Sequence, residues 1–85
     1  MGVKVAKFGG TSLADARQFL KVQKIILSDQ TRKYIVPSAP GKRHNEDTKV
    51  TVLLSLCHTQ FRHKISFEDT FNIIARRFLE IVEDL

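Results

Sequence analysis

The fold is decided at residues 3–12, which read VKVAKFGGTS. Apolar residues and lysines are interspersed in the first half of this stretch, which predicts a short β-strand over Val3–Lys7. Gly9 and Gly10 end the strand, because paired glycines favour a turn. Ser12 is a good N-cap residue, so a helix is expected to begin directly after the turn.

The segment that follows the glycines predicts a helix over Leu13–Ser28. Asp15 stands three residues after Ser12, the spacing of a capping box. A second strand is predicted at Tyr34–Val36, a β-branched and aromatic run that stops at Pro37. A strand, a helix and a strand within about 35 residues form a βαβ unit, which requires a parallel pair of strands. The chain is therefore expected to be an α/β protein.

The second half of the chain predicts a loop followed by two helices. Ser38–Asp47 is polar and rich in turn-forming residues. The helices are predicted at Thr48–Phe61 and, with Ser66 as its cap, at Phe67–Leu85. Each helix carries an apolar stripe at steps of three and four residues. The stripes consist of Val50, Leu53, Leu54, Cys57 and Phe61, and of Phe67, Phe71, Ile74, Phe78, Ile81 and Leu85.

The end of the last helix departs from the usual helix pattern. Glu83 and Asp84 lie in its last turn, where the helix dipole disfavours negative charge, and no glycine follows. We therefore expect the chain to be a piece of a longer protein. Arg76 and Arg77 are expected on a solvated face, with Glu80 as the partner of Arg76 four residues on.

The composition indicates at most one small globular domain. The 85 residues are 42% hydrophobic and 27% charged, and their net charge is +5. This charge suits an anionic partner such as a nucleotide or a nucleic acid. The basic residues are scattered, so nucleic-acid binding is a hypothesis that rests on charge alone, and we expect no nucleic-acid partner. No apolar run approaches the roughly 20 residues that span a bilayer, so no membrane partner is expected.

The residues that usually bind metals or form disulfides point to neither role. Cys57 is the only cysteine, which excludes an intramolecular disulfide and fits a reducing cytoplasm. It lies on an apolar stripe and is expected to be a small core residue. His44, His58 and His63 lack the spacing of metal ligands, so no metal site is predicted.

The turn between the first strand and the first helix is the best candidate for a binding site. Glycines let a backbone approach a ligand closely, and a helix N-terminus offers free N–H groups to a phosphate. Lys7 could neutralise phosphate charge as the phosphate is transferred. The turn is neither a P-loop nor a dinucleotide-binding fingerprint. On spacing alone, a plain glycine turn with a capped helix remains an equal alternative.

Three segments resemble, in order, the motifs of one family. Residues 5–12, VAKFGGTS, resemble the signature of the aspartokinases within the amino-acid-kinase family. Residues 36–41, VPSAPG, resemble the second glycine-bearing loop of that family. Residues 51–54, TVLL, resemble its Thr-(Asp/Asn)-x-Leu segment, although Val52 stands where the family usually has Asp or Asn. The resemblance covers about Val3–Leu54, more than half of the chain.

The resemblance implies a fold and a set of site residues. The fold would be part of a three-layer α/β/α amino-acid-kinase domain, with residues 1–85 as its incomplete N-terminal part. Lys7 would be catalytic, and the ATP phosphates would lie on Lys7, Phe8, Gly9 and Gly10. Ser38 and Thr51 would bind the substrate, with Thr48 as a weaker candidate for the role of Thr51.

The activity that the resemblance implies is transfer of the γ-phosphoryl group of ATP, with Mg²⁺, to the β-carboxylate of L-aspartate. This reaction is the first step of lysine, threonine and methionine biosynthesis. Later segments of the family's site have no counterpart here, so the chain is expected to be inactive alone. An alternative hypothesis is an interaction module without catalysis, in which the exposed apolar helix Phe67–Leu85 forms a homo-oligomer.

Overall fold

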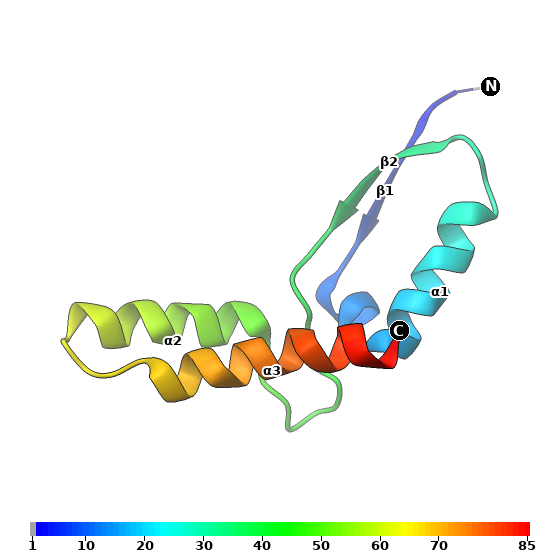
Figure 1. Cartoon of the computed structure of the whole chain (residues 1–85). Coiled ribbons are helices and arrows are strands. Elements are labelled where there is room, and N and C mark those ends of the chain that lie inside the picture. Colours follow the sequence, from blue (N-terminus) through cyan, green and yellow to red (C-terminus); the bar gives the residue numbers. More distant parts are fainter. Residues whose placement is uncertain (1) are drawn as a thin grey trace.

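The structure is a computed structural model that describes residues 2–85. Figure 1 shows a βαβ unit joined to a pair of antiparallel helices. The elements are β1 (Lys4–Phe8), the short 3-10 helix η1 (Gly10–Leu13), α1 (Ala16–Leu27), β2 (Arg32–Pro37), α2 (Val50–Arg62) and α3 (Glu68–Asp84). The predicted α/β class and the predicted order of elements are confirmed. Each predicted boundary lies within a few residues of the observed one, except at the start of the first helix.

The βαβ unit holds the first of two small cores. β1 and β2 pair in parallel, with Ala6 opposite Ile35, and α1 covers one face of the pair (Figure 1). Phe8, Leu13 and Val22 are buried between the strands and the helix. Burial of side chains of this size stabilises the folded chain by roughly 1.5–3 kcal/mol each, which is the main force that holds α1 on the sheet.

The start of the first helix differs from the prediction. Instead of one helix from Leu13 capped by Ser12, the chain forms η1 and then begins α1 at Ala16. Asp15 is the N-cap of α1, with extended backbone angles, and its carboxylate accepts a hydrogen bond from the N–H of Gln18 at 3.0 Å. The capping-box prediction is wrong because Asp15 caps a new helix rather than supporting a helix already begun. The interruption lets Leu13 and Ala14 turn into the interior, where each is 3% exposed.

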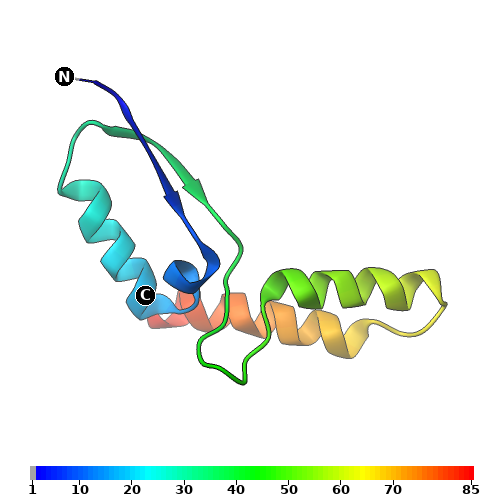
Figure 2. The ribbon, with the colours of Figure 1, turned by 180° about the vertical axis from the view of Figure 1, so that it is seen from behind.

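The helices α2 and α3 lie side by side in both ribbon views and form the second core (Figure 2). Val50 and Leu53 of α2 are buried against Ile74 of α3, with Cys57 at the margin of this cluster. The prediction that Cys57 is a small core residue fits this position. The N-cap of α3 is Phe67 rather than Ser66, whose hydroxyl accepts a long 3.4 Å hydrogen bond from the N–H of Glu68.

The buried face of α3 differs from the predicted stripe. Its buried residues are Thr70, Ile74, Arg77 and Ile81. The stripe predicted through the phenylalanines points largely outward, since Phe71 is 54% exposed. The predicted solvated position of Arg77 is wrong, because its side chain is only 4% exposed. The predicted pairing of Glu80 with Arg76 is also replaced, because Glu80 accepts a hydrogen bond from Arg43 at 3.3 Å.

Two glycines hold the connecting loops against each other. We call residues 9–15 the first loop and residues 38–49 the second loop. The N–H of Gly41 donates to the carbonyl oxygen of Gly10 at 2.8 Å. A Cβ on Gly41 would lie 2.6 Å from the carbonyl carbon of Gly10, and a Cβ on Gly10 would lie 3.0 Å from the Cα of Gly41. None of the glycines in residues 2–85 has a positive φ, so glycine is needed here for space rather than for backbone freedom.

The second loop is closed by an ion pair. The carboxylate of Asp47 accepts hydrogen bonds from Arg43 Nε at 2.7 Å and Nη2 at 3.0 Å, and from its backbone N–H at 2.9 Å. The bonds from the Arg43 guanidinium hold the pKa of Asp47 well below its ordinary range. The folded chain therefore prefers the ionised carboxylate more strongly than the unfolded chain does.

We predict that Gly41→Ala destabilises the chain, because the added methyl group would overlap main-chain atoms that cannot rotate away. We expect a loss of about 1–3 kcal/mol in the free energy of unfolding, measured by urea denaturation. Gly9→Ala is the matched control, since a Cβ there would meet nothing within 4 Å and φ is −76°. Equal effects from the two substitutions would contradict the close contact of the loops.

We also predict a pH dependence that is specific to Asp47. The pKa of Asp47 is lower in the folded chain than in the unfolded chain, so the ionised carboxylate stabilises the fold above the unfolded-state pKa of about 3.9. This contribution is lost as the pH falls below about 3.9 toward the folded-state pKa. Asp47→Asn should therefore lower the melting temperature at pH 7, and its difference from the wild type should shrink between about pH 5 and pH 3. A difference that stays constant over this range would show that the ionised carboxylate is not what closes the loop.

Candidate functional site

Both strands end at the same edge of the sheet, and the two loops start there together. Phe8 of β1 lies opposite Pro37 of β2 in the parallel register. The N–H of Ser38 donates to the carbonyl oxygen of Phe8 at 3.0 Å, which extends the pairing by one step. In open α/β sheets, ligands bind outside the carboxyl ends of parallel strands, so this edge is where a site is expected.

The two loops and the start of α2 enclose a hollow of about 250 Å³. It is lined by Gly10, Thr11, Ser38, Ala39, Pro40, Gly41, Lys49 and Thr51. Gly10, Ser38 and Thr51 are residues that the sequence analysis proposes for the site. The fold thus brings together residues from three separate segments of the chain.

The N-terminus of α2 borders this hollow. The N–H of Val50 donates to the carbonyl oxygen of Pro40 at 3.1 Å, which fixes the start of the helix against the second loop. Lys49 occupies the N-cap position, and the first turn of α2 carries no acidic residue. Lys49 and the positive end of the helix dipole lie at the same border, and a lysine and a helix N-terminus both favour an anion.

The remaining proposed phosphate-binding residues lie beside the hollow. Lys7 and Gly9 are exposed, and neither is among the residues that line it. The side chain of Phe8 is buried in the core of the βαβ unit. Phe8 does not line this hollow, and its ring packs with Leu13 and Val22, so only its main chain is proposed to contact the phosphates.

The structure separates the two candidate threonines. Thr51 lines the hollow, whereas the carbonyl oxygen of Thr48 accepts a hydrogen bond from Arg77 Nη1 at 2.9 Å. Val52, which stands at the family's Asp or Asn position, is 53% exposed and does not line the hollow. Thr51 is therefore the better positioned of the two threonines.

The sequence analysis gives no site role to the other five lining residues, of which Thr11 and Lys49 have polar side chains. Lys49 stands next to the predicted start of the second helix, and a basic residue at a helix N-terminus could have indicated an anion site. Thr11 belongs to the segment 5–12 that resembles the aspartokinase signature, but the resemblance gives it no role of its own. It lies on η1, and the N–H of the next residue, Ser12, closes the turn by donating to the carbonyl oxygen of Gly9 at 3.1 Å.

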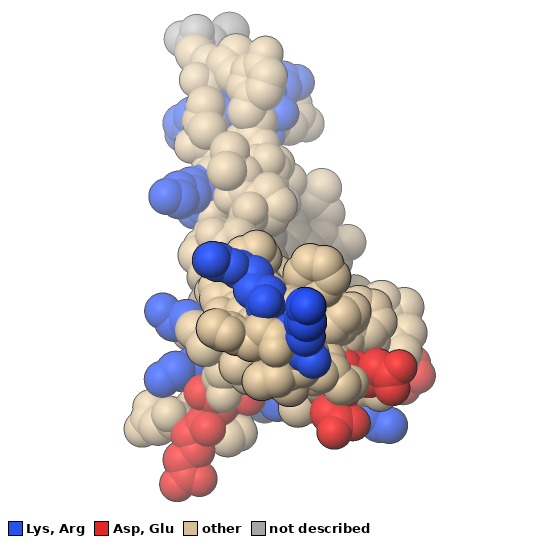
Figure 3. All heavy atoms as spheres, turned by 90° about the vertical axis from the view of Figure 1, so that its left-hand side faces the viewer, with Lys and Arg blue, Asp and Glu red and all other residues tan. Residues whose placement is uncertain are grey.

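The chemistry of the lining suits an anion and offers no cluster of metal ligands. Lys49 is its only charged residue. Within residues 2–85, no three side chains of His, Cys, Asp or Glu are gathered so as to hold a metal ion. Figure 3 shows basic side chains at separate places on the face that it presents, with acidic ones nearby. No helix in the described part of the chain is long and apolar enough to cross a membrane.

Comparison with known proteins identifies relatives of the chain. No family model matches it. It is 45% identical over 83 residues to aspartokinase 3 of Bacillus subtilis, which is 98% of this chain and 18% of that protein. A crystal structure of the aspartate kinase of Clostridium acetobutylicum matches with a TM-score of 0.91 and 57% identity, over 95% of this chain and 19% of that one. The chain spans less than one fifth of the length of either relative, and over that span it is similar to both of these aspartokinases.

Proposed function

We propose that the chain supplies the phosphate-binding and substrate-binding loops of an aspartokinase. The reaction is transfer of the γ-phosphoryl group of MgATP to the β-carboxylate of L-aspartate. The observation that carries this proposal is the hollow that joins Gly10, Ser38 and Thr51 to Lys49 at the N-terminus of α2. Anions are the ligands that such a border favours, and both substrates are anions.

The proposed chemistry requires little of the protein beyond placement and charge. The substrate carboxylate has an unperturbed pKa near 3.9, so it is already a nucleophile at neutral pH and needs no general base. Phosphoryl transfer is then catalysed mainly by positioning and by stabilising negative charge. The main chain of Phe8, Gly9 and Gly10 would approach the ATP phosphates, and Lys7 would neutralise charge on the transferred group.

The second loop and α2 would hold the other substrate. The hydroxyl groups of Ser38 and Thr51 can donate to carboxylate oxygens, and Lys49 adds a positive charge at the same border. The hollow contains no acidic side chain to hold Mg²⁺ directly. The hydroxyl and N–H donors of the hollow suit phosphate oxygens, and Mg²⁺ would be held mainly by those phosphate oxygens, as it commonly is with nucleotides. The ion would neutralise phosphate charge during transfer.

A second candidate function is self-association through the outer face of the helical pair. Phe61, Phe67, Phe71 and Phe78, which we call the phenylalanine face, are each more than 40% exposed. The rings of Phe61 and Phe67 meet edge to face with centroids 6.3 Å apart, so the face continues from α2 to α3. Exposed apolar groups in such a cluster usually mark an interaction surface. We propose a second copy of the chain as the partner.

We predict that the chain binds MgATP and that Lys7→Ala weakens this binding about tenfold or more, since a hydrogen bond to a charged group contributes roughly 1.5–3 kcal/mol. Isothermal calorimetry measures the affinity, with Lys21→Ala on the exposed side of α1 as the control. Addition of aspartate should release no ADP, because the chain spans less than one fifth of its relatives. Equal affinities of the wild type and Lys7→Ala would contradict the role of Lys7, and aspartate-dependent turnover would contradict the expected inactivity.

For the phenylalanine face, we predict concentration-dependent association of the wild type in sedimentation experiments. Phe71→Glu should abolish it, because a charge would be buried in the apolar contact. Ile73→Glu is the matched control: Ile73 is 53% exposed, close to the 54% of Phe71, but lies about 200° around the helix from it. A wild type that stays monomeric at high concentration would remove this candidate.

A further inference from the structure

The buried arginine of α3 contacts every segment that borders the hollow. Arg77 Nη2 donates to the carbonyl oxygen of Gly41 at 2.7 Å and, more weakly, to that of Ala14 at 3.4 Å. Its Nη1 donates to the carbonyl oxygen of Thr48 at 2.9 Å. Ala14 belongs to the first loop, Gly41 lies near the beginning of the second loop, and Thr48 lies at the end of that loop, two residues before α2.

The position of this charge needs an explanation beyond packing. Arg77 lies between Ile74 and Ile81 on the buried face of α3, where an apolar side chain would avoid the cost of removing a charge from water. The nearest carboxylate oxygen, on Asp47, is 3.6 Å from Nη1, and within residues 2–85 the Nε of Arg77 has no hydrogen-bond partner. The charge is thus compensated mainly by main-chain carbonyl groups of the loops.

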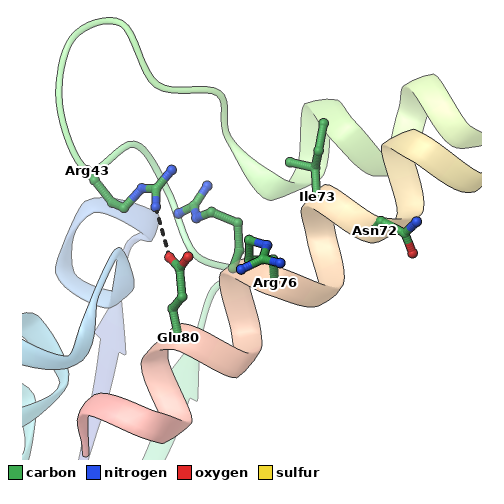
Figure 4. A pocket seen from close by; sticks show the side chains of 6 residues that line it. Arg43, Asn72, Ile73, Arg76 and Glu80 are labelled. Carbon is green, nitrogen blue, oxygen red and sulfur yellow. Dashed lines mark hydrogen bonds and ion pairs between the residues drawn. The ribbon is translucent and has the colours of Figure 1, made fainter.

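A second contact joins the same loop to the same helix. Figure 4 shows Arg43 of the second loop reaching Glu80 of α3, and their side chains are 3.3 Å apart. This pair is partly exposed, so it contributes little by itself. Arg43, Arg77 and Glu80 line the same depression beside α3. The contacts of Arg77 and the Arg43–Glu80 pair hold α3 against the loops.

We propose that Arg77 is a positioning residue of the site: it sets the spacing of the first loop, the second loop and the start of α2, and thereby the affinity of the hollow for an anionic substrate. Arg77 does not line the hollow, so it acts through the residues that do. A shift of α3 would move all three carbonyl contacts together. The inference deepens the proposed function and rests on it for the nature of the ligand.

The test compares MgATP affinity, measured by calorimetry, among variants shown by circular dichroism to be folded. Arg77→Met keeps the bulk of the side chain and removes its donors, whereas Arg77→Lys keeps the charge but cannot bridge three carbonyl groups. We expect the affinity for MgATP to fall about tenfold in Arg77→Met and less in Arg77→Lys, because the binding groups of the loops would no longer be held at the right spacing. Arg76→Met, beside it on the exposed surface, should bind as the wild type does. Wild-type affinity in folded Arg77→Met would overturn the inference.

Two further measurements keep the inference open to refutation. If Arg77→Met does not fold, the MgATP affinity of Arg77→Lys is the test. If neither variant folds, we expect the guanidinium NMR signals of Arg77 in the wild type to shift when MgATP is added. Absence of that shift would overturn the inference. If the wild type binds no MgATP, the proposed function fails, and the role of Arg77 is tested in the free protein by NMR.

In the free protein, we expect the amide signals of Gly10, Gly41 and Thr51 to change in Arg77→Lys and not in Arg76→Met. Unchanged signals in Arg77→Lys would overturn the inference about Arg77.

Discussion

The contact between Gly10 and Gly41 is the constraint on which the rest of the structure depends. The hydrogen bond of 2.8 Å between their main chains leaves no room for a side chain at either position. It joins the loop after β1 to the loop after β2, which the parallel register has already delivered to the same edge. The hollow exists because these loops are held at this distance and because α2 starts against them.

The electrostatics of the site follow from where the charges are neutralised. Arg43 and Asp47 neutralise each other within the second loop, and Arg77 is surrounded by carbonyl oxygens behind it. Lys49 at the start of α2 is left facing the border of the hollow without an acidic residue in the first turn of the helix. Lys49 is therefore the charged side chain that the described residues offer to an anionic substrate in the hollow.

The architecture also accounts for the large apolar surface of the chain. The fold is elongated, with extents of 54 × 25 × 22 Å, and its buried residues form two small clusters instead of one core. Each cluster buries only a few side chains, so a large share of the apolar residues, including the phenylalanine face, stays in contact with solvent.

Signals between neighbouring residues were enough to locate the strands, the helices and the two glycine loops. Alternation and turn residues located both strands to within two residues, because these signals depend on neighbours along the chain. The three segments that resemble aspartokinase motifs, residues 5–12, 36–41 and 51–54, each contributed one proposed residue of the hollow: Gly10, Ser38 and Thr51. The role of Asp15 was not predicted, since Ser12 and Asp15 are both good N-caps and only the packing of Leu13 selects between them. Only the tertiary structure decided that Arg77 is buried and that Lys49 borders the hollow. The reason is physical: an arginine on a helix pattern looks solvated until distant segments bring carbonyl groups within reach of its guanidinium group.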